Sequence, residues 1–169
     1  MRYFHIPNFH FAIPSWFKLK MKPLGLHYKI KFNDSCRYNL DNLDQQDWNK
    51  LNGITNAVFG NAQYSQTFMM VWRYNVITKK FEIGAYLHNY PEQERSTPED
   101  NKTVYVMDGD SCDVMVLIQD KIRINIDNSK IEIPTNIKFN HIVRETNPWF
   151  GGNNPAPQFI HFEVEFNVA

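Results

Sequence analysis

Long hydrophobic runs are missing from this chain of 169 residues. The longest unbroken apolar runs, residues 68–72 and 114–118, have five residues each, whereas a membrane-spanning helix needs about 20. Residues 1–22 are rich in aromatic side chains but are interrupted by Pro7 and Pro14, so they lack the continuous apolar stretch of a signal peptide. We therefore expect no targeting segment at the N-terminus and no contact with a membrane.

The chain also has no net charge and only two cysteines. Eighteen Lys and Arg residues balance eighteen Asp and Glu residues, so the formal net charge is zero. A dedicated nucleic-acid-binding protein usually carries a basic excess, so we expect no nucleic-acid partner. Two cysteines, Cys36 and Cys112, are too few for a small secreted scaffold that depends on disulfides. We expect free thiols, because a bridge would require the strands that carry them to lie side by side.

Sequence signatures of catalysis are also absent. The chain has no GxSxG, phosphate-binding loop, HExxH or CxxC motif, and its six histidines are scattered. The aspartates of the segment DGDSCD, Asp108, Asp110 and Asp113, hint at a calcium loop, but the EF-hand spacing is missing and a β-turn explains them. These absences predict a protein that is not an enzyme and holds neither a metal nor another cofactor.

One polar group near the end of a predicted strand leaves an alternative open. It consists of His141, Arg144 and Glu145. A base beside an arginine that neutralises a carboxylate is what elimination from a uronic acid requires. The simpler interpretation is an exposed strand end with a salt bridge.

Alternation of apolar and polar residues is the strongest pattern that the chain does contain. It runs through residues 160–168, which predicts a strand with one face on a core. The same pattern recurs at 28–32, 81–87 and 122–126, and the sequence Asp127-Asn128-Ser129 predicts a turn. Alternating strand–helix units are absent. We therefore expect an all-β protein, a two-sheet antiparallel β-sandwich of jelly-roll, concanavalin-like type, with a closed barrel as the alternative.

One short helix is expected, from about Asp44 to Leu51. Asp44 can cap its N-terminus, Leu43 and Trp48 occupy the positions of a hydrophobic staple, and Gly53 suits a C-terminal cap.

The chain shows no internal repeat or linker. We expect an extended aromatic N-terminal arm at residues 1–22 and a single β-sandwich domain at residues 23–169. The charged segment 91–102, which contains two prolines, is the best candidate for a mobile loop.

Aromatic residues make up 15% of the chain, and most of the phenylalanines are expected in the core. Trp16, Tyr90 and Trp149 fall in loop-like sequence, where they can face a partner or a ligand. The most distinctive segment is NPWFGGNNPAPQ, residues 147–158, in which Gly151-Gly152 permits positive φ and close approach of the backbone. This segment is either the rim of a ligand site or a corner between sheets.

The segment WFGGNNPAP, followed by the alternating terminal strand, resembles a signature of small uncharacterised β-sandwich proteins encoded by Bacteroidetes and their tailed phages. Three further segments are similar to that group in the same order: IKFNDSCRYNL at 30–40, DWNKLNGI at 47–54, and the Trp72-Arg73 strand followed by IGAYLHNY. The FGG corner is also similar to concanavalin-like jelly rolls, among them polysaccharide lyases and sugar-binding modules.

The resemblance implies a non-enzymatic structural or adhesive component of a bacteriophage virion. Such a component would lie in the particle and bind other virion proteins, or further copies of itself as a homo-oligomer. The expected partner-binding anchors are aromatic residues of the arm: Phe4, Phe9, Phe11, Trp16 and Phe17.

Two other functions remain as hypotheses. The first is a carbohydrate-binding module that recognises a glycan, a polysaccharide of the host surface, through Trp72, Arg73, Trp149, Asn153 and Asn154. The second is a polysaccharide lyase, which would need titratable groups that converge in a groove across one sheet.

Overall fold

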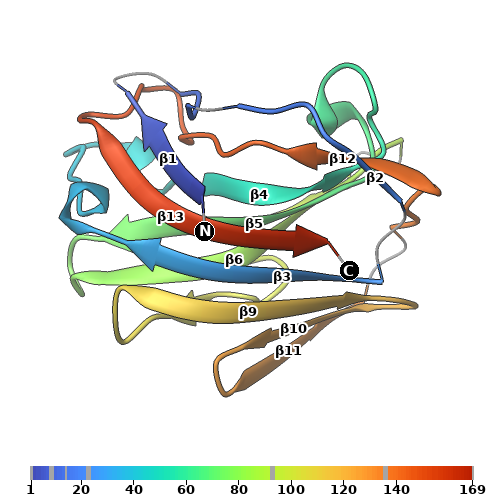
Figure 1. Ribbon diagram of the computed structural model, residues 1–169. Coiled ribbons are helices and arrows are strands. Elements are labelled where there is room, and N and C mark those ends of the chain that lie inside the picture. Colours follow the sequence, from blue (N-terminus) through green and yellow to red (C-terminus); the bar gives the residue numbers. More distant parts are fainter. Residues whose placement is uncertain are drawn as a thin grey trace.

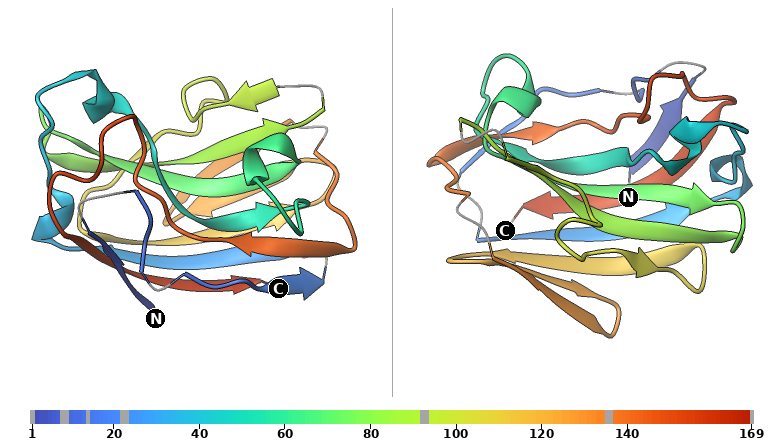
Figure 2. Two further views of the ribbon diagram at one scale, coloured as in Figure 1. Left: turned by 90° about the horizontal axis from the view of Figure 1, so that it is seen from above. Right: turned by 180° about the vertical axis from the view of Figure 1, so that it is seen from behind.

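The computed structural model describes residues 2–7, 10–13, 15–21, 24–91, 94–134 and 137–168. These residues form two antiparallel β-sheets that pack face to face, which Figures 1 and 2 show as two layers. The predicted all-β sandwich is therefore confirmed. None of the helices in the described residues is long and apolar enough to cross a membrane.

Sheet A contains both ends of the chain. Its strand order is β1-β13-β3-β9-β10-β11, so the first strand pairs with the last one (Figure 1). The strands are β1 (Arg2–Ile6), β13 (Ile160–Val168), β3 (Gly25–Phe32), β9 (Ser111–Ile118), β10 (Ile122–Ile126) and β11 (Ser129–Ile133). The expected turn at Asp127-Asn128 joins β10 to β11, and Asp127 has a φ of 49° there.

Sheet B has the order β2-β12-β4-β5-β6-β7, and β8 pairs with β6 beside that path. Its strands are β2 (Leu19–Met21), β12 (Ile142–Thr146), β4 (Asn49–Thr55), β5 (Thr67–Asn75), β6 (Lys80–Asn89), β7 (Glu94–Ser96) and β8 (Tyr105–Val106). Strand β7 lies within the segment 91–102 that was expected to be a loop, and it pairs with the end of β6.

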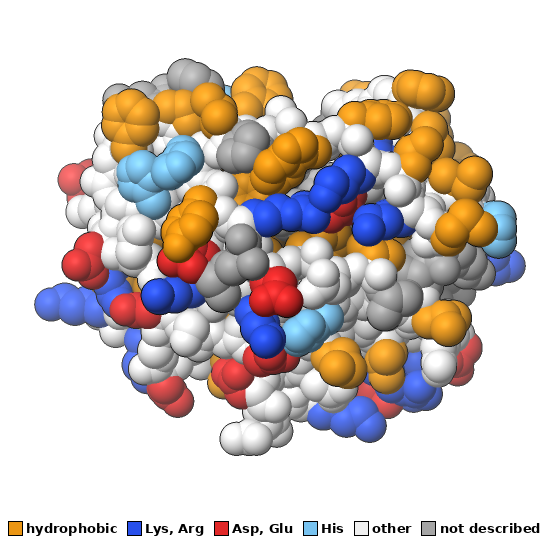
Figure 3. Space-filling model, in the orientation of Figure 1, with side chains coloured by type: hydrophobic (Ala, Val, Ile, Leu, Met, Phe, Trp, Pro, Cys, Tyr) orange, Lys and Arg blue, Asp and Glu red, His pale blue; other side chains and the backbone are white. Residues whose placement is uncertain are grey.

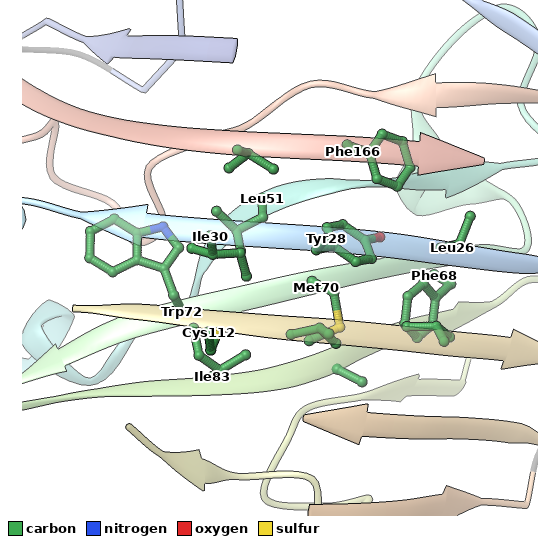
Figure 4. Close-up of a cluster of buried hydrophobic side chains, with 14 of the residues drawn as sticks. Leu26, Tyr28, Ile30, Leu51, Phe68, Met70, Trp72, Ile83, Cys112 and Phe166 are labelled. Atoms are coloured by element: carbon green, nitrogen blue, oxygen red, sulfur yellow. The ribbon is translucent and has the colours of Figure 1, made fainter. Parts of the chain in front are cut away.

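Alternation decides which side chains fill the space between the sheets. In β13, Ile160, Phe162 and Val164 are buried, whereas His161 and Glu163 are half-buried on the outer face. Figure 4 shows side chains of both sheets that meet in this core, among them Tyr28, Ile30, Met70, Trp72 and Ile83.

Sheet B is covered on part of its outer face too. Every residue from Thr67 to Trp72 in β5 is buried, which explains the apolar run at 68–72. The outward-facing residues Met69 and Val71 join Trp48 and Tyr86 in a second apolar cluster, separate from the main core.

The predicted helix is wrong in length and position. The segment Leu43–Gln46 forms a 3₁₀ helix, η2, capped by Asn42, whose side chain accepts a hydrogen bond from the Asp44 N–H at 2.9 Å. Leu43 is 91% exposed, so it forms no staple with Trp48. Strand β4 begins at Asn49 because pairing with β5 overrides the local helix signals. Two further 3₁₀ helices are η1 (Asp34–Cys36) and η3 (Ala62–Tyr64).

Gly53, expected as a helix cap, lies in β4. A Cβ at this position would meet the Phe68 carbonyl oxygen at 2.0 Å. The glycine therefore serves the close approach of β4 to β5.

The described part of segment 1–22 is not a separate arm. It supplies an edge strand to each sheet, since β1 pairs with β13 and β2 pairs with β12. Phe4 has no exposed surface. Its ring stacks on Phe162 at 5.6 Å and meets Trp16 edge-on at 5.7 Å. The apolar face of β1 therefore completes the core, and Phe4 is not available as a surface anchor.

Both cysteines are free, as the sequence predicts, and both are buried. Burial raises the pKa of each thiol, Cys36 and Cys112, to about 12. Both therefore remain protonated at neutral pH.

The burial of Phe4 predicts its contribution to stability. Phe4→Ala should lower the free energy of unfolding by about 3–5 kcal/mol, because it leaves a cavity between β1 and β13. Tyr3→Ala is the matched control, since the neighbouring Tyr3 is 64% exposed and a surface substitution changes stability by about 0.5 kcal/mol or less. Urea denaturation measures both. Equal effects of the two substitutions would show that β1 is not docked in solution.

Candidate functional site

A groove crosses the outer face of sheet B. Its volume is about 800 Å³, and side chains of β4, β5, β6, β7 and β12 line it together with Phe11, Ala12, Ser15 and the loop segment 147–149. The segment 60–63, which includes η3, contributes further lining residues. Both aromatic and cationic side chains line this groove.

The floor of the groove carries Tyr86 and His88. They are two residues apart in β6, so they share one face of the sheet, here the outer one. Their ring centroids are 5.1 Å apart. Lys50 of β4 places its amine 5.3 Å from the centroid of the Tyr86 ring, and Arg95 of β7 lies 6.0 Å from the same centroid. Arg95 reaches this position because it is the direct register partner of His88.

Positive charge predominates in the groove. Among the described lining residues are Lys50, Arg95 and Arg144, and none is an aspartate or glutamate. Burial, and then the charges of Arg95 and Lys50, lower the pKa of His88 to about 4, so this ring is neutral at pH 7. Burial also lowers the pKa of Lys50, an effect that Asp47 opposes and Arg95 reinforces. A partly desolvated Lys50 therefore lies close to the exposed Arg95.

The wall beside Lys50 is aromatic. The backbones of Lys50 and Trp149 exchange two hydrogen bonds, with N···O distances of 2.7 and 3.0 Å. The Trp149 ring, which is 36% exposed, stacks on His10 at 5.4 Å and meets Phe11 edge-on at 4.4 Å. Of the residues predicted to bind carbohydrate, Trp149 is the one that the structure places in the groove.

The two glycines that follow Trp149 explain how this wall is held. A Cβ on Gly151 would lie 2.4 Å from the Trp48 carbonyl oxygen, and the Gly151 N–H donates to Asn49 Oδ1 at 2.8 Å. Gly152 has a φ of 81°, a conformation that glycine adopts without strain. The segment 147–158 therefore forms a tight corner against β4 and also contributes to the rim of the groove.

The other residues predicted to bind carbohydrate serve the fold. Trp72 is fully buried between the sheets, because its side chain points inward from β5. Arg73 points outward but is occupied: its guanidinium contacts Glu82 at 2.6 Å and Glu99 at 2.8 Å, and it lies 4.3 Å from the centroid of the Trp48 ring.

Asn153 and Asn154 hold the corner to η2. Their backbone N–H groups donate to Asp44 Oδ2 at 3.0 and 2.9 Å, and Asn154 Nδ2 donates to the same oxygen at 2.6 Å. Asp44 therefore anchors this loop, and it does not cap a helix.

The polar group His141, Arg144 and Glu145 is divided between two faces. Arg144 and Glu145 are neighbours in β12, so they point to opposite sides of sheet B. Arg144 lines the groove, whereas Glu145 is buried and forms ion pairs with Arg2 at 3.4 Å and Lys18 at 3.8 Å. Glu145 therefore forms salt bridges, as the simpler interpretation expects, but it is buried and does not lie at an exposed strand end.

The aspartates of the DGDSCD segment do not converge on one point. Asp108 pairs with Lys80 at 2.8 Å, Asp110 pairs with Arg37, and Asp113 contacts His27 at 2.9 Å. Within the described ranges, no three His, Cys, Asp or Glu side chains come together as a metal site.

The predicted partner-binding anchors are scattered. Phe4 is in the core, Phe11 lies in the groove wall, and Phe9 is outside the described residues. Trp16 is half-buried, with Arg2 5.1 Å and Lys18 5.7 Å from the centroid of its ring. Phe17 is 57% exposed and stacks on Phe59 at the surface.

Sequence reasoning missed Lys50, Tyr86, His88 and Arg95. Tyr86 and His88 are separated by Leu87, so the alternation in β6 does place them on one face. Lys50 and Arg95 gave no comparable signal, because the position of each depends on the register of its strand with the neighbouring strand, in which Lys50 faces Val71 and Arg95 faces His88.

Comparison with known proteins identifies the fold. No protein-family model and no curated protein matches this sequence. The structure is similar to a functionally unknown protein from Saccharomyces cerevisiae, with a TM-score of 0.53, 6% identity, and coverage of 90% of this chain and 73% of that chain. It is also similar to an alginate lyase from Pseudomonas aeruginosa, with a TM-score of 0.51, 8% identity, and coverage of 86% of this chain and 64% of that chain. At such low identity these similarities show the fold alone.

The cationic surroundings of His88 predict its titration. The ring should titrate near pH 4, below its ordinary pKa of about 6.5. Between these two pH values the unfolded chain binds the proton that the folded protein does not, so His88 makes the fold less stable as the pH falls through this window. Lys50→Met should raise the pKa of His88, because it removes one of the two charges that lower it. An NMR titration of the histidine ring protons measures this.

Lys29→Met on β3 is the control, since Lys29 is exposed on the outer face of sheet A. It should leave the His88 titration unchanged. A pKa near 6.5 for His88 in the wild-type protein would contradict the crowded, desolvated arrangement of charges.

Proposed function

We propose that this protein binds an acidic carbohydrate chain in the groove of sheet B. The observation that carries the proposal is the charge of the groove. Lys50, Arg95 and Arg144 line it without a carboxylate among its described residues, in a chain whose net charge is zero. An anionic ligand would supply the missing counter-charges.

The energetic argument rests on desolvation. Burial lowers the pKa of His88, and the charges of Arg95 and Lys50 lower it further, so two cations act on a partly desolvated part of the groove. A carboxylate or sulfate group bound between them would form charge-assisted hydrogen bonds, each of which contributes about 1.5–3 kcal/mol. The groove therefore favours an acidic ligand over a neutral one.

The aromatic wall favours a carbohydrate among acidic ligands. Trp149 and Phe11 present partly exposed rings, and flat rings cover the apolar faces of sugars. The nearby segment 60–63 adds the amide side chains of Asn61 and Gln63 to the lining, and amides can both donate to and accept from sugar hydroxyls. Alginate lyase shares the fold, which is compatible with the proposal but does not assign a function.

Titration calorimetry with defined oligosaccharides tests the proposal. Uronic-acid oligosaccharides should bind, more weakly as salt is added, and neutral glucan oligosaccharides should not. Arg144→Ala and Arg95→Ala should each weaken binding about tenfold or more, because each removes one charge-assisted contact. Arg123→Ala, on β10 of the opposite sheet, should have no effect. Equal binding of neutral and acidic chains, or equal effects of all three substitutions, would contradict the proposal.

The ultraviolet absorbance of the same protein and oligosaccharide mixtures distinguishes binding from cleavage. An increase in ultraviolet absorbance during incubation would show that an unsaturated uronic acid forms, which elimination produces. That result would replace the binding proposal with a lyase, in which the neutral His88 and the adjacent Tyr86 are the candidate base and acid. Unchanged absorbance together with saturable binding supports the binding function.

A second candidate function follows from the resemblance to phage-encoded proteins: docking to other virion proteins. One observation favours it. An exposed apolar patch surrounds the edge strand β2 and consists of Phe17, Leu19, Met21, Phe59 and Ile142. Figure 3 shows apolar side chains gathered at its upper right, over β2, β12 and the loop after β4. Phe17 and Phe59 stack there with ring centroids 5.8 Å apart, which is typical of aromatic anchors in interfaces.

The docking function predicts the effect of removing these rings. Phe17→Ala combined with Phe59→Ala should abolish self-association or incorporation into particles while the sandwich stays folded, because both rings are exposed. Mass photometry of the purified protein and mass spectrometry of intact particles measure this. Ile77→Ala, at an 87% exposed position in the β5–β6 turn, is the control. A wild-type monomer that is absent from particles would rule out docking and leave the groove as the functional site.

A further inference from the structure

Two histidines face each other on the outer face of sheet A. His5 of β1 is the direct register partner of His161 of β13. Their ring centroids are 4.6 Å apart, and the two Nδ1 atoms are in contact. His5 is exposed and His161 is half-buried. Figure 3 shows pale-blue histidine side chains together at its upper left, over the end of β1 and the start of β13.

The backbone hydrogen bonds show which kind of pair this is. The N–H and C=O of His5 bond to Ile13 at 2.8 and 2.7 Å, on the side away from β13. The N–H of His161 donates to Ser35 Oγ at 2.7 Å, and its C=O accepts from Cys36 Sγ at 3.1 Å, on the side away from β1. The two residues therefore form a non-hydrogen-bonded pair, the type in which side chains on neighbouring antiparallel strands come closest.

The same contacts hold the backbones of both residues in place. His5 is held between two backbone neighbours, β13 and Ile13, and the η1 turn holds the backbone of His161. Phe159 also lies nearly parallel to the His161 ring, with centroids 6.5 Å apart. A pair of ligands on paired strands with supported backbones is already organised for binding.

We propose that His5 and His161 form a binding site for a late divalent transition-metal ion such as Zn²⁺, Ni²⁺ or Cu²⁺. Neutral imidazole nitrogens are preferred ligands of these ions, and here two Nδ1 atoms point at one another. Where the rings touch, one Nδ1 must donate a proton and the other accept it. The ion would lie between the two Nδ1 atoms in place of that proton, which would move to Nε2 of the same ring, so that both imidazoles stay neutral.

The geometry requires little rearrangement. Two nitrogens bound at about 2.0–2.1 Å to one ion lie roughly 3 Å apart, so a small outward rotation of the rings admits it. Water would fill the further coordination positions of the ion. The ion would join the first strand of the chain to the last one.

Titration calorimetry with Zn²⁺ and Ni²⁺ tests the site. The wild-type protein should bind one ion per chain, and His5→Ala or His161→Ala should each weaken binding at least tenfold. The double variant should be no weaker than either single variant, because a chelate is lost when one ligand is removed. His27→Ala is the matched control, since His27 lies on the same sheet face and contacts Asp113 at 2.9 Å; it should bind as the wild-type protein does. Mg²⁺ and Ca²⁺, which prefer oxygen ligands, should not bind.

NMR of the wild-type protein keeps the test independent of variant folding. Zn²⁺ should shift the ring Nδ1 resonances of His5 and His161 together and leave those of His27 unchanged. The thermal midpoint should also rise with added ion, because only the folded chain brings the two rings together. Absence of binding at millimolar ion, or binding that either single substitution leaves intact, would overturn the proposal.

Discussion

Contact between Trp72 of sheet B and the rings of sheet A is the interaction on which the rest of the structure depends. Trp72 lies 4.7 Å from Phe32 and 6.1 Å from Phe162, between ring centroids, and it has no exposed surface. Such aromatic pairs contribute about 0.5–1.5 kcal/mol each beyond their buried area. Because this ring fixes the inner face of β5, it also fixes the outward residues of the same strand, Met69 among them, as part of the groove. The groove therefore lies on the outer face of the same sheet whose inner face packs in the core.

A short polar chain connects that core to the groove wall. The Tyr38 hydroxyl accepts a hydrogen bond from Asn49 Nδ2 at 2.6 Å, and Asn49 Oδ1 accepts one from the Gly151 N–H at 2.8 Å. All three groups are buried, so each polar atom needs its partner. These hydrogen bonds hold the FGG corner against β4 and bring Trp149 beside Lys50. A loop with three prolines and two glycines thereby becomes an ordered wall.

The separation of charge arises from the alternation of strand residues. Arg144 and Glu145 are adjacent in β12, yet one faces the groove and the other faces Arg2 and Lys18 inside the molecule. A chain with balanced charge therefore has a cationic groove on one sheet. The opposite sheet face carries mixed charges and the His5–His161 pair, so the two proposed sites lie on different sides of the sandwich and can be tested independently.

The sequence by itself determined the all-β class, the inward and outward faces of strands such as β3, β10 and β13, the β10–β11 turn and the two free thiols. These features follow from a local period of two and from composition, which need no knowledge of distant contacts. Only the tertiary structure decided that residues 2–6 form a strand of sheet A, that Lys50, His88 and Arg95 meet in one groove, and that His5 faces His161. His5 and His161 are far apart in sequence, and Arg95 meets His88 only through the register of β7 on β6. Alternation tells which side chains share a face of one strand, but strand order and register depend on hydrogen bonding and packing between strands that no local pattern encodes.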